Sequence, residues 1–308
     1  MRSEEKKLVS VVIVAYRSAD TIEETLDSIY TQTYPNIELI ISDDASPDNT
    51  VEVAQAWVDA HKERFVNCVV LTHEKNQGVS GNLNDGIRAS TGWYIKDFAA
   101  DDLLLPEYLE THVAYLEENG LDSVFSDVQA FQTHNGEKEF ISYPGPAGPE
   151  FFDAPAEVQY RMLLQGNRLY SPTFLATRAL YEKNGLYDER FPLMEDYPYY
   201  LKLAKQGSKL NYLNVKQVAY RMGEASISNG VDSRVLSPYY HKAMKAFFYG
   251  ERIHGLWKMR DFKYLLKTIW ELFFGDCILA FGNNRKSALV RFCEYMKDTK
   301  FIHKQEDQ

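Results

Sequence analysis

The first hundred residues alternate between short apolar, β-branched runs and longer amphipathic segments, and this alternation limits the fold more than any other feature. The apolar runs have the composition of strands that are covered on both faces. We expect strands at residues 9–14, 37–42, 66–72 and 93–98, with helices at 18–34, 46–63 and 78–90. Strands that alternate with helices in this way predict a mostly parallel sheet with helices on both faces.

The pattern changes after the fourth strand. Further segments are expected as a helix at 106–119, a strand at 124–133, helices at 156–164, 177–184 and before Gly207, and edge strands at 210–221. Residues 143–155 hold four prolines and two glycines, which predicts a loop of the length often used for lids and binding loops. From 237 onward the pattern is helical. We therefore expect an α/β domain at residues 1–235 and a helical extension at 236–308.

Charge and composition limit the classes of partner. The net charge of −10 argues against binding to nucleic acid, which needs a basic face. From Glu251 onward the chain has 11 Lys and Arg against 8 Asp and Glu, a balance of +3, so the first 250 residues carry −13. This basic, aromatic tail indicates either peripheral contact with an anionic membrane surface or helices that pack on the body.

Two features of the sequence indicate where in the cell the protein is located. They are its three widely spaced cysteines and the lack of a long apolar run. The cysteines show no spacing typical of a metal site or a disulfide framework, which favours a reducing compartment. No stretch reaches the roughly 18 apolar residues of a membrane-spanning helix. We expect a cytoplasmic protein, at the inner face of the membrane if its tail binds there.

Polar residues follow each of the four expected strands. In a parallel sheet the carboxyl ends of the strands meet at one edge, where ligands bind. The residues at this edge are Tyr16, Asp43, Asp44, Asn76, Asp101 and Asp102. Two adjacent carboxylates without nearby His or Cys suit a hard cation such as Mg²⁺ or Mn²⁺, which in turn suits a diphosphate. The alternative is that Asp101 and Asp102 lie in a solvated turn or cap the helix that follows.

The order of the motifs resembles the family 2 glycosyltransferases. It is carried by VSVVIVAYRSADT, SDDAS, NQGVSGNLNDGI, IKDFAADDLLLP and LMEDYPYYLKLAKQG, over residues 8 to 228. The resemblance implies a GT-A fold, a Rossmann-like nucleotide-sugar-binding fold with a mixed, mostly parallel sheet. It also implies inverting transfer from a nucleoside-diphosphate sugar, above all a UDP-sugar, to a hydroxyl of a saccharide or lipid-linked saccharide. The cofactor would be Mn²⁺ or Mg²⁺, and the product a surface polysaccharide or glycolipid.

The resemblance assigns the donor site residue by residue. Tyr16 matches the position that lies against the nucleotide base, and Asp44, assisted by Asp43, matches the carboxylate that binds the base. The stretch that lies close to the nucleotide is matched by Asn76, Gly78, Asn82 and Asn84. Glycine in this stretch permits close approach of the backbone.

The metal motif of the family departs from its usual DxDD form in this chain. Ala99 occupies the position of the first aspartate, and Asp101 and Asp102 remain. The resemblance implies Asp102 as the metal ligand and Asp101 as a contact to metal, ribose or sugar. Asp97 lies before the motif, and we interpret it as an irregularity at a strand edge without a catalytic role.

A second acidic pair matches the family's catalytic base. Asp196 aligns with the carboxylate that deprotonates the acceptor hydroxyl, and Glu195 precedes it. The alternative is that both are acids favoured by a helix N-terminus. Arg221 resembles an arginine that pairs with the diphosphate, in a segment that also holds Ser226 and Ser228, although the histidine that often follows is absent.

Two other functions compete with sugar transfer. A non-catalytic nucleotide-sugar-binding or scaffolding module would bind the nucleotide without turnover. A nucleotidyltransferase would need a glycine-rich phosphate loop after the first strand, and VAYRSADT contains no glycine.

Overall fold

The computed structural model describes residues 6–134, 137–222 and 234–298. The described chain divides into two compact units. The first unit holds the residues up to Leu163 and those from Asn167 to Met222, and the second joins Leu164–Gly166 to the residues from 234 onward. The boundary expected between residues 235 and 236 stays a prediction.

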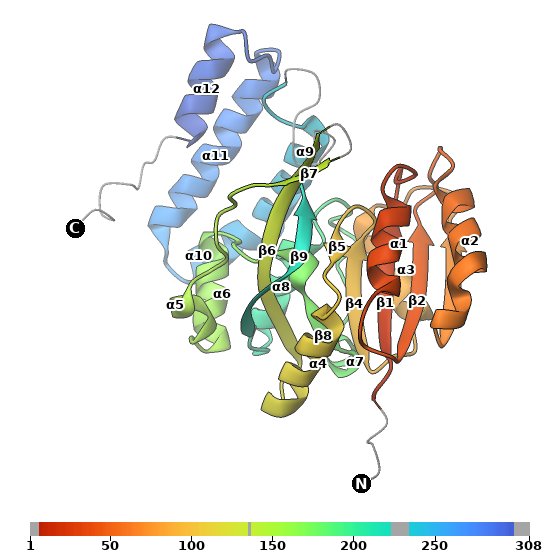
Figure 1. The fold of residues 1–308 in the computed structure, drawn as a ribbon. Coiled ribbons are helices and arrows are strands. Elements are labelled where there is room, and N and C mark those ends of the chain that lie inside the picture. Colours follow the sequence, from red (N-terminus) through yellow and green to blue (C-terminus); the bar gives the residue numbers. More distant parts are fainter. Residues whose placement is uncertain (1–5, 135–136, 223–233, 299–308) are drawn as a thin grey trace. The chain divides into compact units, whose positions relative to one another are not determined.

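A mixed β-sheet forms the framework of the first unit (Figure 1). Its order is β3-β2-β1-β4-β8-β6-β9-β5, and β7 pairs with β6. The strands are β1 (Val9–Ala15), β2 (Ile37–Asp43), β3 (Asn67–Thr72), β4 (Tyr94–Ala99), β5 (Leu103–Leu104), β6 (Ser123–His134), β7 (Glu137–Phe140), β8 (Leu175–Thr177) and β9 (Tyr212–Arg221). The first four in this order from β3 to β4 are parallel, so their carboxyl ends lie at one edge. The predicted GT-A type of sheet is confirmed.

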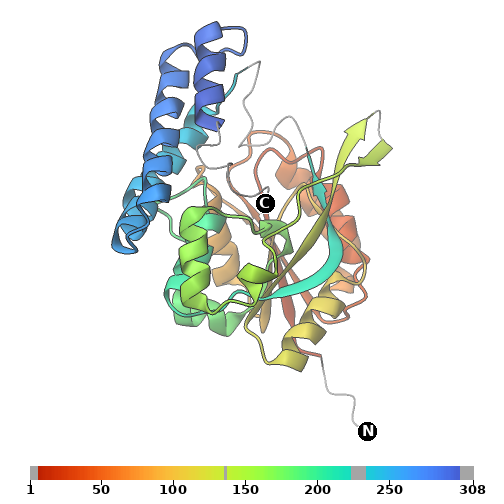
Figure 2. The same ribbon diagram turned by 90° about the vertical axis from the view of Figure 1, so that its left-hand side faces the viewer.

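Helices cover both faces of the parallel half of the sheet (Figures 1 and 2). The helices of this unit are α1 (Ile22–Tyr30), α2 (Thr50–His61), α3 (Val79–Ala89), α4 (Tyr108–Asn119), α5 (Pro149–Phe152), α6 (Ala156–Gln165), α7 (Arg178–Asn184) and α8 (Asp196–Lys205). Buried residues of α1, α2 and α4 share one core with β1 and β2, whereas α3 packs on the opposite face. Burial on both faces explains the continuous apolar runs of the central strands.

Two expectations about the second half of this sheet are wrong. Residues 210–221 are not edge strands, because β9 lies between β6 and β5. The stretch after Asp102 does not lead directly into a helix, because Leu103 and Leu104 first pair with Ala219 and Val218 of β9. Two apolar residues carry no periodicity, so the sequence could not distinguish a two-residue strand from the beginning of a helix.

The second unit is helical, as expected for the C-terminal part of the chain. It contains α9 (Pro238–Phe247), the π-helical turn η3 (Phe248–Arg252), α10 (Ile253–Lys258), α11 (Phe262–Ala280) and α12 (Ala288–Asp298). Phe274 and Ile278 of α11 pack with Val290 and Cys293 of α12. Within the described parts of the chain, no helix has both the length and the hydropathy needed to cross a bilayer.

Candidate active site

The loop that carries Asp101 and Asp102 is held by hydrogen bonds from α1. The hydroxyl of Thr21 donates to the carbonyl of Ala100 at 2.7 Å, and that of Thr25 donates to the carbonyl of Asp102 at 2.9 Å. The Asp102 side chain is buried, and its Oδ1 accepts the backbone N–H of Arg221 at 2.8 Å. Burial raises the pKa of Asp102 well above its ordinary value, and the adjacent Asp101 carboxylate raises that pKa further.

The helix-cap alternative for this aspartate pair is wrong. Helix α4 begins at Tyr108, with Glu107 at its N-cap, and strand β5 separates it from Asp102. Neither aspartate therefore satisfies the free N–H groups of a helix. Two crowded carboxylates at the end of a parallel strand, without a helix to cap, form a site suited to a positive charge.

The Arg221 guanidinium fixes this loop from the side of β9. Its Nε donates to the Asp101 carbonyl at 2.7 Å, and its Nη1 donates to the Thr133 hydroxyl at 3.0 Å. Its Nη2 pairs with the Glu24 carboxylate, and the group lies 4.7 Å from the centre of the Phe131 ring. These contacts make Arg221 a clamp between α1, β6 and the aspartate loop. Its predicted contact with the diphosphate stays a prediction, and Ser226 and Ser228 lie outside the described residues.

The predicted base-binding residues lie together at the ends of β1 and β2. The Asp44 carboxylate accepts the backbone N–H groups of Gln77 and Gly78 at 2.7 and 2.9 Å, and the Asn76 side chain donates to its carbonyl at 3.2 Å. Asp43 Oδ2 is buried and has no hydrogen-bond partner among the described residues. Tyr16 is 44 % exposed. β1 ends at Ala15, which pairs with Asp43 of β2, so Tyr16 and Asp43 lie at neighbouring strand ends. The unpaired carboxylate oxygen of Asp43 could accept a hydrogen bond from a polar ligand.

The asparagines of α3 are used inside the protein. Asn82 exchanges hydrogen bonds with Ser42 of β2, at 2.6 Å for its acceptor and 2.9 Å for its donor. The Asn84 side chain bonds the backbone of Tyr187 in both directions at 3.0 Å. Both side chains are buried, and their assignment as nucleotide contacts stays a prediction. Their observed contacts tie α3 to β2 and to the loop that leads to α8.

Gly78 allows α3 to approach that same loop. Its φ is +83°, and a Cβ placed on it would lie 2.5 Å from both the Cβ and the carbonyl oxygen of Pro192. Two residues after Gly78, the Ser80 hydroxyl donates to the carbonyl of Phe191 at 2.8 Å. The beginning of α3 is therefore packed directly against the segment that leads to Glu195.

The second acidic pair lies at the beginning of α8, as both the family resemblance and the helix N-terminus alternative predict. Glu195 is the N-cap and Asp196 is the first helical residue, and both side chains are partly buried. The Asn167 side chain donates to Asp196 Oδ2 at 3.3 Å. Burial, with the neighbouring Asp196 as a second cause, raises the pKa of Glu195 to about 8, and burial raises the pKa of Asp196 as well. A carboxylate with a raised pKa is a stronger base than an ordinary one.

Tyr220, the residue before Arg221, was not assigned a role of its own from the sequence. Burial raises the pKa of the Tyr220 phenol, and the charges of Asp102, Asp101 and Asp196 raise it further. All three carboxylates therefore lie within electrostatic reach of one hydroxyl group. The signal in the sequence was only the position of Tyr220 next to Arg221.

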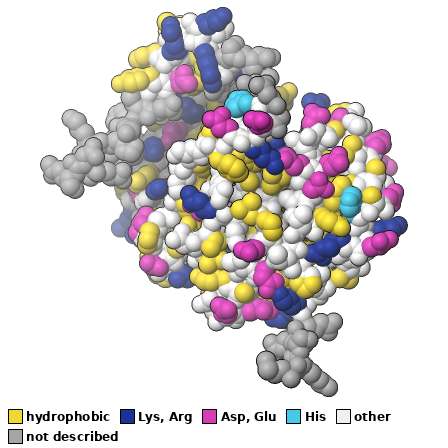
Figure 3. Space-filling model, viewed as in Figure 1, with side chains coloured by type: hydrophobic (Ala, Val, Ile, Leu, Met, Phe, Trp, Pro, Cys, Tyr) yellow, Lys and Arg dark blue, Asp and Glu magenta, His cyan; other side chains and the backbone are white. Residues whose placement is uncertain are grey.

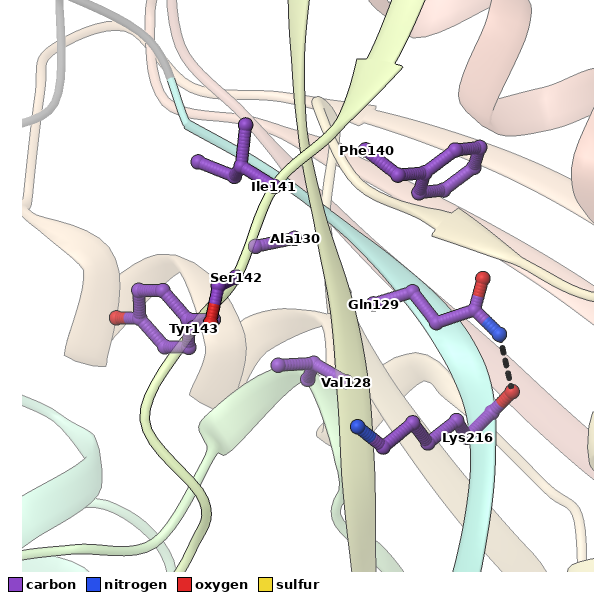
Figure 4. Close-up of a pocket in the computed structure, with 8 residues that line it drawn as sticks. All are labelled: Val128, Gln129, Ala130, Phe140, Ile141, Ser142, Tyr143 and Lys216. Carbon is purple, nitrogen blue, oxygen red and sulfur yellow. Dashed lines mark hydrogen bonds between the residues drawn. The ribbon is translucent and has the colours of Figure 1, made fainter.

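Tyr220 belongs to an aromatic cluster beside a small cavity. The Tyr143 ring lies 5.6 Å from that of Tyr220 and 5.5 Å from that of Tyr170. Tyr143 also lines a cavity of about 260 Å³ between β6, the segment after β7 and β9 (Figure 4). The residues that line it are Val128, Gln129, Ala130, Phe140, Ile141, Ser142, Tyr143 and Lys216. The segment 143–155 thus begins at this cavity, but the prediction of a loop is wrong for Pro149–Phe152, which forms helix α5.

Asp97 is not at a strand edge, so this part of the sequence interpretation is wrong. It lies in β4, which pairs with β1 on one side and β8 on the other, and it is buried. Its Oδ2 accepts the Tyr187 hydroxyl at 2.8 Å, and its Oδ1 has no partner among the described residues. The charge of Asp97 also contributes to the raised pKa of Glu195 and of Asp196. Tertiary packing brings a residue dismissed in the sequence close to the predicted base.

Comparison with known proteins identifies the family. The model of "Glycosyl transferase family 2" matches residues 10–183, which is more than half of the 308 residues. The chain belongs to glycosyl transferase family 2. It is therefore a glycosyltransferase, and the family predicted from the motif order is confirmed.

A curated relative and two solved structures resemble this glycosyltransferase. The Escherichia coli UDP-Glc:alpha-D-GlcNAc-diphosphoundecaprenol beta-1,3-glucosyltransferase WfaP is 27 % identical over 82 % of this chain and 95 % of its own. The S. aureus TarS 1–349 complex with UDP-GlcNAc has a TM-score of 0.59 at 19 % identity, covering 86 % of this chain and 71 % of that one. The mannosyltransferase PcManGT from Pyrobaculum calidifontis, in complex with GDP-Man and Mn²⁺, has a TM-score of 0.55 at 17 % identity, covering 95 % and 74 %. At these identities the two structures establish the GT-A fold alone.

Proposed function

We propose that this glycosyltransferase moves a sugar from a UDP-sugar to a hydroxyl of a lipid-linked saccharide, with inversion at the anomeric carbon and with a divalent cation. The observation that carries the proposal is that this member of family 2 places one acidic pair, Asp101 and Asp102, directly after β4 and a second pair, Glu195 and Asp196, at the beginning of α8. A cation held by the first pair can bind the leaving diphosphate, while the second pair activates the acceptor hydroxyl.

The aspartate pair fits a hard cation. Asp101 and Asp102 offer carboxylate oxygens, and Asp102 is buried with an incompletely neutralised charge. Within residues 6–134, 137–222 and 234–298, no group of three His, Cys, Asp or Glu side chains could hold a metal. Mg²⁺ and similar ions commonly bind through one or two carboxylates and complete their shell with substrate phosphates and water. The bound cation would neutralise the charge that develops on the departing diphosphate.

The Asp196 carboxylate is the proposed general base. It accepts the proton of the acceptor hydroxyl while the acceptor oxygen forms a bond to the anomeric carbon, and the bond from that carbon to the diphosphate oxygen breaks. UDP leaves with the electron pair, and attack from the opposite side inverts the anomeric configuration. The raised pKa of Asp196 supports this role, because it brings proton affinity closer to neutral pH.

The choice of donor and acceptor is supported by the names of the relatives. WfaP is a UDP-Glc-dependent enzyme that acts on GlcNAc-diphosphoundecaprenol, and this chain covers 95 % of it. TarS has been solved with UDP-GlcNAc. We propose that the enzyme acts at the cytoplasmic face of a membrane, where a lipid-linked acceptor would be available, in the synthesis of a surface polysaccharide or glycolipid.

A transfer assay tests the proposal. The purified chain is incubated with Mn²⁺, a panel of UDP-sugars and an undecaprenyl-diphosphate-linked GlcNAc, and product is followed by mass spectrometry. Asp102→Asn and Asp196→Asn should each lower the rate by about 100-fold or more, while Asp59→Asn, a change of the same type on the exposed face of α2, should not. Full activity in both site variants would refute the assignment. Nucleotide binding without product from any acceptor would instead favour a non-catalytic module.

A further inference from the structure

Helix α11 presents a continuous stripe of large apolar side chains to solvent. The residues follow one another at intervals of four, three and four, which places them on one face of the helix. They are Phe262, Leu266, Ile269 and Phe273, with exposed fractions of 50, 67, 45 and 58 %. The buried side chains of α11 stand at other positions, including Leu265, Leu272 and Ile278. Exposed apolar surface that is concentrated in this way marks an interaction site.

The unit that carries this stripe is basic, although the protein as a whole is acidic. Residues 234–297 contain 12 Lys and Arg and 5 Asp and Glu, a net charge of +7, whereas the whole chain carries −10. Two of those acids are already paired, since Asp276 binds Lys245 and Glu271 lies 3.7 Å from Lys267. Figure 3 shows Lys and Arg side chains gathered over the α11 and α12 pair, with hydrophobic side chains beside them. The excess positive charge thus belongs to the same unit as the exposed apolar side chains.

Aromatic residues extend the exposed apolar surface beyond α11. Trp257 of α10 is 62 % exposed and Tyr295 of α12 is 66 % exposed. Such rings are enriched at the interface between lipid and water, where an apolar body and a polar edge are both satisfied. A helix that combines an apolar stripe, flanking Lys residues and neighbouring Trp and Tyr has the properties of a helix that lies in the plane of a membrane surface.

We propose that the apolar stripe of α11 and the cations around it bind the surface of a bilayer that contains anionic lipids. Lipid is favoured over a protein partner because the local charge of +7 complements an anionic headgroup layer. The stripe enters the boundary between headgroups and acyl chains, and Lys258 and Lys263, at the junction of α10 and α11, lie near the phosphates. The inference gives a physical basis to the membrane location proposed above, but it does not depend on sugar transfer.

Vesicle sedimentation tests this surface. The purified full chain, without nucleotide sugar or acceptor, is mixed with vesicles of equimolar phosphatidylglycerol and phosphatidylcholine or of phosphatidylcholine alone. We expect binding to the anionic vesicles, with little binding to the neutral ones. Binding should fall steeply at about 1 M salt, where the screening length is about 3 Å. Equal binding to both kinds of vesicle, or none to either, would overturn the proposal.

Two sets of variants separate the apolar and the electrostatic contributions. Leu266→Asp with Phe273→Asp should lower the partition coefficient more than tenfold, whereas Val66→Asp with Val158→Asp, at exposed apolar positions of the first unit, should leave it unchanged. Each of Lys258→Gln and Lys263→Gln should lower it about fivefold. Wild-type binding by these variants would refute the assignment, as would a dimer in solution that the Leu266 and Phe273 changes dissociate.

A last control separates this inference from the proposed activity. Asp196→Asn should bind the anionic vesicles as the wild type does while losing transfer. A chain that binds vesicles but transfers no sugar would refute only the proposed reaction. If the chain transfers sugar to a short, water-soluble acceptor but does not bind vesicles, only the proposed membrane-binding surface would be refuted.

Discussion

The backbone N–H of Arg221 donates to Oδ1 of Asp102 at 2.8 Å, although 119 positions separate the two residues in the sequence. The bond forms because β5, which follows Asp102, pairs with the last residues of β9. Since the donor is a backbone group, any residue other than proline at position 221 can supply it. The Arg221 side chain has a separate task, which is to hold the aspartate loop against α1 and β6.

Arg221→Ala should therefore lower activity at least tenfold without unfolding the protein. The variant keeps the backbone hydrogen bond to Asp102 but loses the side-chain bonds to Asp101, Thr133 and Glu24. This loss should lower the free energy of unfolding by about 1–3 kcal/mol. Transfer rate and urea denaturation measure the two effects. Lys138→Ala is the matched control, because Lys138 also pairs with Glu24 but lies outside the aspartate loop. Equal losses of activity in both variants would contradict the clamp.

The two acids at the beginning of α8 should differ in kinetic effect. Asp196→Asn should lower kcat by about 100-fold to 10,000-fold, the range expected for loss of a general base. Glu195→Gln should have a smaller effect, because Glu195, with its pKa raised to about 8, is mostly protonated at neutral pH and its replacement leaves the base in place. Steady-state kinetics with saturating donor distinguishes the two. A greater loss of kcat in Glu195→Gln than in Asp196→Asn would indicate that Glu195, and not Asp196, is the general base.

The stability of the protein should fall as pH rises from about 4.5 to about 8. Burial raises the pKa of Glu195 from 4.5 to about 8, so in this window the folded chain holds a proton that the unfolded chain has released. The free energy of unfolding then decreases with pH. Glu195→Gln cannot titrate and should show a shallower decrease in urea denaturation across the same range. An identical decrease in wild type and variant would show that Glu195 is not the group responsible.

Asp97→Asn should shift the acidic limb of the rate profile to lower pH. The Asp97 charge contributes to the raised pKa of both Glu195 and Asp196, so its removal lowers the pKa of the base. The profile of kcat/KM against pH measures the shift. Asp188→Asn is the control, because Asp188 lies on a neighbouring loop and is paired with Arg190. An unshifted limb in Asp97→Asn would leave this aspartate with a structural role only.

Gly78→Ala should destabilise the fold more than Gly185→Ala does. The two glycines have nearly the same backbone conformation, with φ and ψ of +83° and 164° at Gly78 and of +76° and 166° at Gly185, and share a backbone cost of about 1–3 kcal/mol. Only the Cβ at position 78 would meet Pro192, at 2.5 Å, whereas a Cβ at position 185 comes no closer than 3.8 Å to Lys202 Nζ. The difference between the two midpoints of thermal unfolding therefore reports the contact between α3 and the segment before Glu195. Equal destabilisation would mean that Pro192 moves aside without cost.

The fold class and the family could both be predicted from local patterns in the sequence. Local patterns include the apolar runs of β1 and β2 and the amphipathic helices around them. Such patterns can be recognised in a sequence without knowing which distant segments are in contact. The placement of Asp101 and Asp102 beyond β4 and of Asp196 at the beginning of α8 also followed from local order. The order of these motifs was enough to indicate a glycosyltransferase.

The surroundings of these residues depend on contacts between distant segments and became known from the tertiary structure. The pairing of Leu103 and Leu104 with β9, which excluded the helix cap, joins segments more than a hundred residues apart. The burial of Asp97 against Tyr187 and the position of Tyr220 near both acidic pairs arise in the same way. The spacing of the apolar stripe of α11 is visible in the sequence, but the exposure of the stripe depends on which face of α11 the neighbouring helices cover. Burial and charge environment are properties of contacts between distant segments, and no local pattern contains them.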